Sequence, residues 1–252
     1  MSQQPPQRAM IRAAFSAAAP GYEQAASIQR RILQRLAGFT PAPCNGRLLD
    51  AGAGTGQALA LLRAQHPQAE LLCVDAALGM SQRAGGICAD IEALPLASGS
   101  IAHYWSSLAW QWTDPARAAS EAFRVLAPGG MLQVATLGPR TLWELREAFA
   151  AIDAHAHVRR FTPRDALLAA VTQAGFRLRQ VQQEDQIWCA PDLRSLLREL
   201  RAVGAHSLDA PRRPGLLSRQ AWQSLLAAYE QHRLPAGLPA TYDVIHLIAE
   251  RP

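Results

Sequence analysis

The sequence predicts an α/β protein with a doubly wound, mostly parallel sheet. Short apolar runs typical of buried strands alternate along the chain with segments that have the apolar spacing of helices. The first such run, at residues 48–56, reads LLDAGAGTG and passes through closely spaced glycines into a helix. The chain has 252 residues, of which 49% are hydrophobic, so it is long and apolar enough for a sizeable core.

The expected elements follow one another in a regular order. Residues 8–38 have helical spacing with a break near Pro20-Gly21, and TPAPCNG at 40–46 is typical of a linker. Strands are then expected at 47–52, at 69–75, within 97–110, and at 131–138, 177–188 and 242–250. Helices are expected at 56–65, 114–130, 141–155 and 162–176, and a helical stretch at about 191–232 precedes the last strand.

Two of these helices have clear end signals. The Pro-Gly-Gly sequence at 128–130 should stop the helix that begins at residue 114. In the later helix, Thr162 is expected as the N-cap, Pro163 as the first helical residue and Gly175 at the end. Because strands alternate with helices throughout, the strands are expected to run mostly parallel.

The composition excludes several classes of protein. All 25 basic residues are arginine, and with 20 acidic residues they give a net charge of +5, which permits an acidic partner without indicating nucleic acid. The four cysteines are far apart with no Cys-x-x-Cys pair, so we expect no metal site, no disulfide framework and a reducing compartment. No run approaches 18 apolar residues and the first residues lack an apolar secretory stretch, which predicts a cytoplasmic protein without a membrane segment.

The glycines at 52, 54 and 56 indicate the kind of ligand. A dinucleotide-binding turn would place its third glycine where Gln57 stands, and a phosphate loop needs a lysine, which the chain lacks. A pyrophosphate is therefore a poor fit. Asp50, just before the glycines, suits a ligand with positive charge, such as an α-amino group or a sulfonium, which the backbone of Gly52, Gly54 and Gly56 can approach closely. The alternative is a tight turn without a ligand.

Two further acids favour a nucleoside-containing cofactor. Asp75 ends the second strand, 25 residues after Asp50, where a carboxylate can accept both hydroxyls of a ribose. Asp90 lies 15 residues further, where an adenine amino group would sit. A helix cap or loop acid is the alternative for each one alone. Together, three acids at or near strand ends mark the sheet edge at which open α/β folds bind ligands.

With APGG at 127–130, these residues resemble the S-adenosylmethionine-dependent methyltransferases of the Rossmann-like class, over residues 46–137. The resemblance implies a seven-stranded sheet and S-adenosylmethionine as the cofactor. It implies that Gly52, Gly54 and Gly56 lie beside the methionine moiety, Asp75 on the ribose, Asp90 and Ile91 near the adenine, and Met80 against the adenine. Ser106, in the strand segment IAHYWSS, completes the candidate cofactor residues.

Four further segments are SSLAWQWTDP at 106–115, ATLGPRTLWELREAFAAID at 135–153, LLRELRAVGAHSL at 196–208 and IRAAFSAAAPGYEQAASIQRRI at 11–32. Together they resemble a narrower family, the malonyl-acyl-carrier-protein O-methyltransferases of biotin synthesis. The resemblance implies a helical cap at 1–40 and a methyltransferase domain at 41–252, with a helical lid at about 191–232. It implies a malonyl thioester on acyl carrier protein as the substrate. The sequence does not distinguish this carrier from coenzyme A, and it gives no oligomeric state.

The chemistry of carboxylate methylation decides which residues to seek. The carboxylate is already ionised at pH 7, so no general base is needed, and the site must align the reactants, exclude water and hold the free carboxylate with a cation. Arg140, after a Gly-Pro pair at a strand end, and Arg201, in the helical stretch, are the candidate cations. Tyr22 is a candidate for closing over the cofactor. The candidates for walls of a dry pocket are Trp110, Trp112 and Trp143. Surface or core positions are the alternatives for all of these residues.

The sequence also bears on functions other than carboxylate methylation. SSLAWQW stands where amino-group DNA methyltransferases carry a Pro-Pro motif. Cytosine-C5 methyltransferases need a Pro-Cys nucleophile, but the one such pair, Pro43-Cys44, precedes the glycines. No nucleic-acid partner is therefore expected. A small-molecule methyltransferase of quinone or secondary metabolism, and a non-catalytic cofactor-binding protein, are the alternative functions. Arg194 and Arg198 are among the candidates for a basic rim that contacts an acidic carrier protein, with a solvated surface as the alternative.

Overall fold

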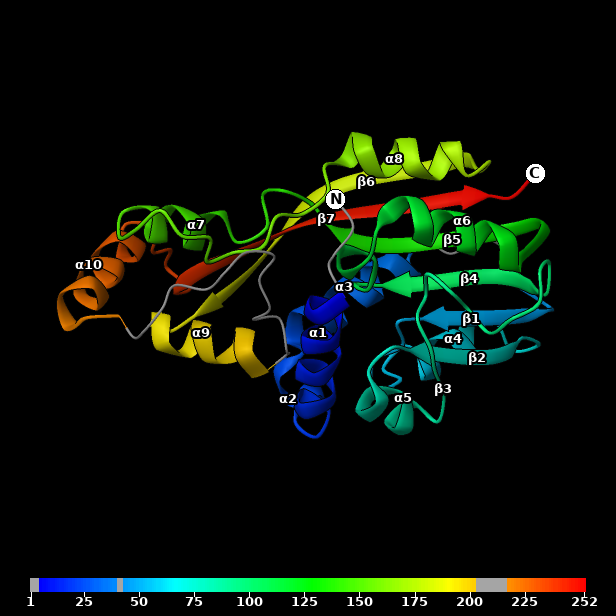
Figure 1. The fold of residues 1–252 in the computed structure, drawn as a ribbon, viewed down its shortest axis with the longest axis horizontal. Coiled ribbons are helices and arrows are strands. Elements are labelled where there is room, and N and C mark those ends of the chain that lie inside the picture. Colours follow the sequence, from blue (N-terminus) through cyan, green and yellow to red (C-terminus); the bar gives the residue numbers. More distant parts are fainter. Residues whose placement is uncertain (1–4, 40–42, 203–216) are drawn as a thin grey trace.

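The computed structural model describes residues 5–39, 43–202 and 217–252. Seven strands form one sheet in the order β3-β2-β1-β4-β5-β7-β6, with helices on both faces (Figure 1). Five strands are parallel, namely β1 (Arg47–Ala51), β2 (Glu70–Asp75), β3 (Ile87–Cys88), β4 (Ile101–Ser107) and β5 (Leu126–Leu137). The last two, β6 (Arg177–Ala190) and β7 (Leu238–Glu250), are antiparallel. The predicted doubly wound, mostly parallel seven-stranded sheet is confirmed.

The described helices fall into three groups along the chain. Three precede the sheet, namely α1 (Pro5–Ala18), α2 (Tyr22–Ala25) and α3 (Ser27–Ala37). Five lie between strands, namely α4 (Leu59–Gln65), α5 (Leu78–Ala84), α6 (Pro115–Val125), α7 (Trp143–Ala150) and α8 (Arg164–Gln173), together with a 3-10 turn at Trp110–Trp112. The last two, α9 (Leu193–Ala202) and α10 (Arg219–Glu230), lie between β6 and β7.

Alternating side chains of the central strands build two cores. Leu48 of β1 and Trp105 of β4 face the layer that contains α3 and α4, and both are fully buried. Their neighbours Leu49 and Tyr104 point to the other face, where α6 and α8 pack, and are also fully buried. Since both faces of the sheet are covered, a ligand reaches the strands at the edge where their carboxyl ends meet.

The predicted end of the helix at 114–130 is wrong. The helix starts as expected, with Asp114 accepting the N–H groups of Ala116 and Arg117, but it stops at Val125. Residue 127 precedes a proline and is disfavoured in helical conformation, which allows β5 to begin at Leu126. The Pro-Gly-Gly sequence therefore lies inside the strand and joins the end of the chain, where Gly129 N–H donates to the Arg251 carbonyl at 2.7 Å.

Other boundaries also differ from the sequence prediction. Thr162 is not the N-cap of α8, because Pro163 is extended and holds that position, so the helix begins one residue later. Gly175 ends the helix with φ +106°, as expected. The expected helical segment 8–38 is interrupted at Ala26 as well as near Gly21. The short elements α5 and β3 were not expected, since seven and two residues carry little periodicity.

The β6–β7 pair extends well beyond the parallel strands and carries α7, α9 and α10 at its far end (Figure 1). Leu196 of α9 and Leu225 of α10 are fully buried in the same core as α3. These two helices occupy the expected helical stretch at 191–232, of which residues 203–216 lie outside the described part of the chain. No described helix has the length and apolarity needed to cross a membrane.

Candidate active site

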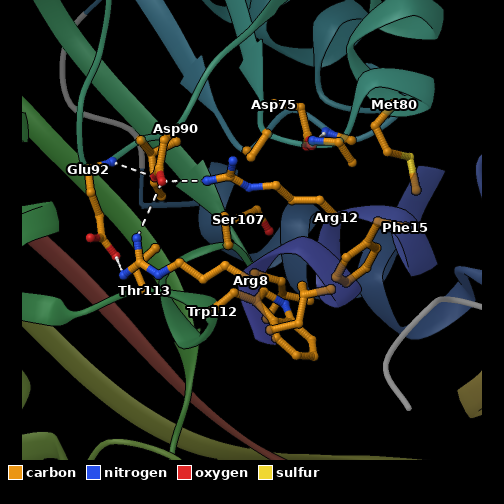
Figure 2. A pocket seen from close by; sticks show the side chains of 18 of the residues that line it. Arg8, Arg12, Phe15, Asp75, Met80, Asp90, Glu92, Ser107, Trp112 and Thr113 are labelled. Carbon is orange, nitrogen blue, oxygen red and sulfur yellow. Dashed lines mark hydrogen bonds and ion pairs between the residues drawn. The ribbon is translucent and has the colours of Figure 1, made fainter. Parts of the chain in front are cut away.

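A pocket lies at the carboxyl ends of β1, β2 and β4, and residues of α1 and α2 form its other side. Figure 2 shows the aromatic, acidic and basic side chains that converge on it. The pocket holds about 790 Å³ of space, including its open mouth, which is within the range of cofactor sites. A second cavity shares Tyr22, Gly52 and Gly54 with the first and continues toward Asp50. The two cavities together form a site long enough to hold separate parts of one ligand.

The turn between β1 and α4 depends on glycine. Gly52, Gly54 and Gly56 have φ angles of +80°, +57° and +89°, which L side chains rarely adopt. A Cβ atom at Gly52 would lie 2.2 Å from the Cβ of Ala109, whereas the Cβ direction at Gly54 is open. Gly52 and Gly54 line the pocket, so their backbone is available to a ligand. Gly56 instead allows α5 to pack closely, because a Cβ at this position would lie 3.3 Å from the Cα of Ala84.

Asp75 is held at the end of β2 by two backbone donors. The Gly54 N–H donates to Oδ2 at 2.9 Å and the Ala77 N–H donates to Oδ1 at 2.8 Å. Burial raises the pKa of Asp75, and these two hydrogen bonds partly oppose that shift. Because each carboxylate oxygen accepts only one of these bonds, both keep acceptor capacity toward the pocket that Asp75 lines. This arrangement suits a pair of ribose hydroxyls.

Asp50 is a buried carboxylate whose Oδ2 accepts no hydrogen bond from the described residues. Asp50 is 3% exposed and lines the second cavity. Burial, followed by the negative charge of Asp75, raises the pKa of Asp50 to about 7. A buried carboxylate without a partner is unfavourable unless a positive group pairs with it. Asp50 therefore fits the α-amino group of S-adenosylmethionine.

The other end of the pocket is apolar on one side and acidic on the other. Met80 and Ile91, which are 1% and 5% exposed, line it together with Phe15 and Trp112. The rings of Phe15 and Trp112 meet edge to face at 5.2 Å. Asp90 also lines this end, and Asp90 Oδ1 accepts the Glu92 N–H at 3.0 Å. An adenine ring would find an apolar surface and a carboxylate here.

Two arginines of α1 reach across the pocket to these acids (Figure 2). Arg12 donates to Asp90 Oδ2 at 2.6 Å, and Arg8 donates to the same oxygen at 3.4 Å and to Glu92 Oε1 at 2.5 Å. Glu92 is 7% exposed and also accepts the Asp114 N–H at 2.8 Å. Sequence reasoning missed Arg8, Arg12 and Glu92, although two arginines one helical turn apart share a face of α1. These ion pairs fasten α1 over the site.

Two candidates from the sequence point away from the pocket, and a near neighbour of each lines it. The Ser106 hydroxyl is buried and donates to the Ala51 carbonyl at 2.6 Å, whereas Ser107 lines both cavities. Trp110 is 3% exposed and packs edge to face on Tyr104 in the core, whereas Trp112 lines the pocket. The sequence did not reveal which side of the strand end faces the ligand.

The candidate cations and Trp143 lie outside the linings of the two cavities. The Arg140 side chain is 66% exposed and pairs with Asp185 of β6, and Arg201 is exposed in the last turn of α9. Trp143 is 38% exposed and meets the His232 ring edge to face at 5.1 Å. Tyr22, at the start of α2, lines both cavities, and burial followed by the Asp75 charge raises the pKa of Tyr22.

The segment TLGPRTLWEL at 136–145 joins the ends of β5 and β7. A Cβ at Gly138 would lie 2.5 Å from Asp243 Oδ2, so only glycine fits. Asp243 is 1% exposed, and its Oδ2 accepts the Arg140 N–H at 3.0 Å. Glu144, also 1% exposed, accepts the Thr241 N–H at 3.3 Å and the Thr241 hydroxyl. This junction fixes the point at which Arg140 leaves the sheet edge.

The fold, the glycine turn and the three acids define the class of Rossmann-like methyltransferases that use S-adenosylmethionine. Residues 49–134 match the methyltransferase domain family. A geranyl diphosphate methyltransferase in complex with S-adenosylmethionine superposes with a TM-score of 0.55, at 14% identity over 88% of this chain and 85% of that one. The [4+2]-cyclase SpnF superposes with a TM-score of 0.56, at 21% identity over 88% and 80%. Such distant similarity shows the fold alone.

Closer relatives define the family. The malonyl-[acyl-carrier protein] O-methyltransferase of Dechloromonas aromatica is 45% identical over 98% of this chain and 95% of its own length. The protein of the same name from Laribacter hongkongensis is 40% identical over 97% and 90%. A biotin biosynthesis bifunctional protein of Cellvibrio japonicus is 38% identical over 94% of this chain and 49% of its own length. The chain belongs to the malonyl-[acyl-carrier protein] O-methyltransferase family. It is an S-adenosylmethionine-dependent O-methyltransferase, as the sequence predicted.

Proposed function

We propose that this enzyme methylates the free carboxylate of a malonyl thioester carried by acyl carrier protein, and that the methyl ester enters biotin synthesis. The observation that carries the proposal is the similarity over nearly the whole chain to relatives with that name, which includes the cap, the 136–145 junction and α9. The bifunctional relative named for biotin biosynthesis supports the same pathway. No observation favours a small-molecule methyltransferase or a non-catalytic binding protein.

S-adenosylmethionine supplies a methyl group on a positively charged sulfur, and the residues of the chain orient that group. Asp50 pairs with the amino group and Asp75 accepts the ribose hydroxyls. The backbone of Gly52 and Gly54 allows close approach, and Tyr22 closes the site from α2. At the other end, Asp90, Ile91 and Met80 hold the adenine. The cap at 1–40 and, within the methyltransferase domain at 41–252, the lid at about 191–232 then serve to exclude water from the cofactor site.

The proposed reaction needs no proton acceptor, because the substrate carboxylate is ionised at neutral pH. Two histidines buried near the sheet suit no such role. Mainly through burial, the pKa of His103 and that of His246 are lowered to about 4, so both side chains are neutral. Neither histidine lines either of the two cavities. An arginine instead holds the carboxylate, with Arg140 as the first candidate and Arg201 as the second. In this role Arg140 exchanges its pairing with Asp185 for the substrate carboxylate.

Transfer of a labelled methyl group tests the proposed acceptor. The enzyme is incubated with methyl-labelled S-adenosylmethionine and either malonyl or propionyl pantetheine thioester, which differ in whether a carboxylate or a methyl group ends the chain. We expect a base-labile labelled ester on the malonyl compound and no label on the propionyl compound. Label on both compounds would contradict carboxylate methylation, and so would an unlabelled malonyl compound together with unlabelled malonyl-loaded carrier protein.

A further inference from the structure

Three arginines lie on the outer face of α9. Arg194, Arg198 and Arg201 are four and three residues apart, so they share one side of the helix, and all three are exposed. The opposite side of α9 packs into the core through Leu193, Leu196 and Leu200. Because the buried side fixes the rotation of the helix, the three arginines lie on the side of α9 that does not pack into the core. We call these three residues the α9 arginine face.

Most of this positive charge is not neutralised within the described chain. None of the three arginines has a carboxylate at ion-pair distance among residues 5–39, 43–202 and 217–252, whereas Arg35 and Arg140 pair with acids of β6. The Arg194 guanidinium lies over the Trp222 ring, 5.7 Å from its centre. Asp192 lies just before α9, and hydrogen bonds from Ser195, followed more weakly by the charge of Arg198, lower the pKa of Asp192.

The helix that carries the α9 arginine face contacts the cap beside the site. Helix α9 packs against α2, and Tyr22, the first residue of α2, lines both cavities. Figure 1 shows α9 beside the N-terminal helices and away from α8, which covers the other side of the sheet. A partner bound to α9 would therefore lie next to the cap that closes over the cofactor.

We propose that the α9 arginine face is the docking surface for the acidic carrier protein that brings the acyl group. The inference rests on the proposed function, because it assumes a substrate attached to a protein. Guanidinium groups bind carboxylates and phosphates, and a carrier protein presents both, on its acidic surface and on its phosphopantetheine arm. Since the arginines are exposed, they act mainly by steering and orienting the carrier rather than by burying ion pairs.

Charge reversal at Arg198 tests the surface, with Arg164→Glu as the matched control. Arg164 is an exposed arginine at the start of α8, so both variants change the net charge equally. We expect Arg198→Glu to raise the Kd for malonyl-loaded carrier protein by about tenfold and Arg164→Glu to leave it within about twofold of the wild type. Both variants should keep wild-type affinity for S-adenosylmethionine, which shows that they fold.

The outcomes separate the docking surface from the reaction. Carrier binding that is equally strong in Arg198→Glu and the wild type, or equally weakened in the two variants, would overturn the docking proposal. Methyl transfer to malonyl pantetheine thioester, which has no carrier protein, tests the reaction independently of α9. If the wild type methylates neither that compound nor malonyl-loaded carrier protein, the proposed reaction is wrong, while selective loss of carrier binding in Arg198→Glu still supports the surface.

Discussion

The carboxyl group of Asp50 lies in surroundings that favour its neutral form. Burial and the charge of Asp75 raise the pKa of Asp50 from 3.8 to about 7. The folded chain thus holds this proton more tightly than the unfolded chain, so the contribution of this group to stability is greatest at low pH and falls as the pH rises from about 4 to about 7. A bound ammonium group reverses the effect, because it pairs with the ionised form.

Cofactor binding should therefore depend on pH through Asp50. We expect the Kd for S-adenosylmethionine to fall as the pH rises from about 5.5 to 7, by up to tenfold per pH unit, and to level off just above that range. Asp50→Asn should bind more weakly and lose this pH dependence. Isothermal titration calorimetry over the pH range measures both effects. As a control, Asp165→Asn, at an exposed acid of α8, should behave like the wild type. An unchanged pH dependence in Asp50→Asn would remove Asp50 from the amino-group site.

Arg140 offers a test of how the substrate is held. Arg140→Ala should lower kcat/KM for malonyl thioester by about 2–5 kcal/mol in activation free energy, because the substrate carboxylate loses its cation. Affinity for S-adenosylmethionine should stay unchanged, since Arg140 lies outside both cavities. Asp185→Asn is the control, because it breaks the same ion pair but leaves the arginine in place. Full activity in Arg140→Ala would transfer the role to Arg201.

Sequence reasoning could find the glycines of the turn and the acids at strand ends, because each is marked by its local sequence. Asp50 and the glycines of the turn stand within seven residues, and their chemistry needs no distant partner. In contrast, Arg8 pairs with Glu92 across 84 residues of sequence, and no local pattern indicates such a contact. The choice between Ser106 and Ser107 depends on the twist of β4 at its end, which the sequence does not define.

At the scale of elements, α1 acts as a cover that is attached by charge. Its ion pairs to Asp90 and Glu92 are partly buried, and Phe15 adds an aromatic contact with Trp112. Helix α1 packs against α5, where the Gly79 N–H donates to the Ser16 hydroxyl at 3.2 Å. Such an element can open without disturbing the core.

Removing one ion pair should loosen α1 selectively. Arg8→Gln leaves the nearly buried Glu92 with less positive charge, so the amide hydrogens of α1 should exchange several-fold faster while those of β1 and β4 are unchanged. Dissociation of S-adenosylmethionine should become faster as well. Hydrogen-exchange mass spectrometry and stopped-flow measurement check the two effects. Arg63→Gln, at an exposed arginine of α4, should change neither, and equal exchange in all three proteins would argue against an electrostatic attachment.

For the whole molecule, the alternation of strands and helices was sufficient to predict the fold class. The strand boundaries were harder to predict. The structure adds five residues at the start of β5, where Leu126 pairs with Ile101 of β4 and Gly129 and Gly130 form backbone hydrogen bonds with Arg251. The strand expected at 177–188 is found with two more residues at its end, and the strand expected at 242–250 begins four residues earlier, at Leu238. These features depend on contacts between segments far apart in the sequence, which no local propensity encodes.

The central claim is that a carrier-bound malonyl group is the methyl acceptor, and intact-protein mass spectrometry tests it most directly. Malonyl-loaded acyl carrier protein is incubated with the enzyme and S-adenosylmethionine, beside carrier protein that bears only the phosphopantetheine arm. The account predicts that the malonyl form gains the mass of one CH₂ unit, located on the acyl group, and that the unloaded form gains none. A malonyl form of unchanged mass, or an equal gain on both forms, would contradict the account.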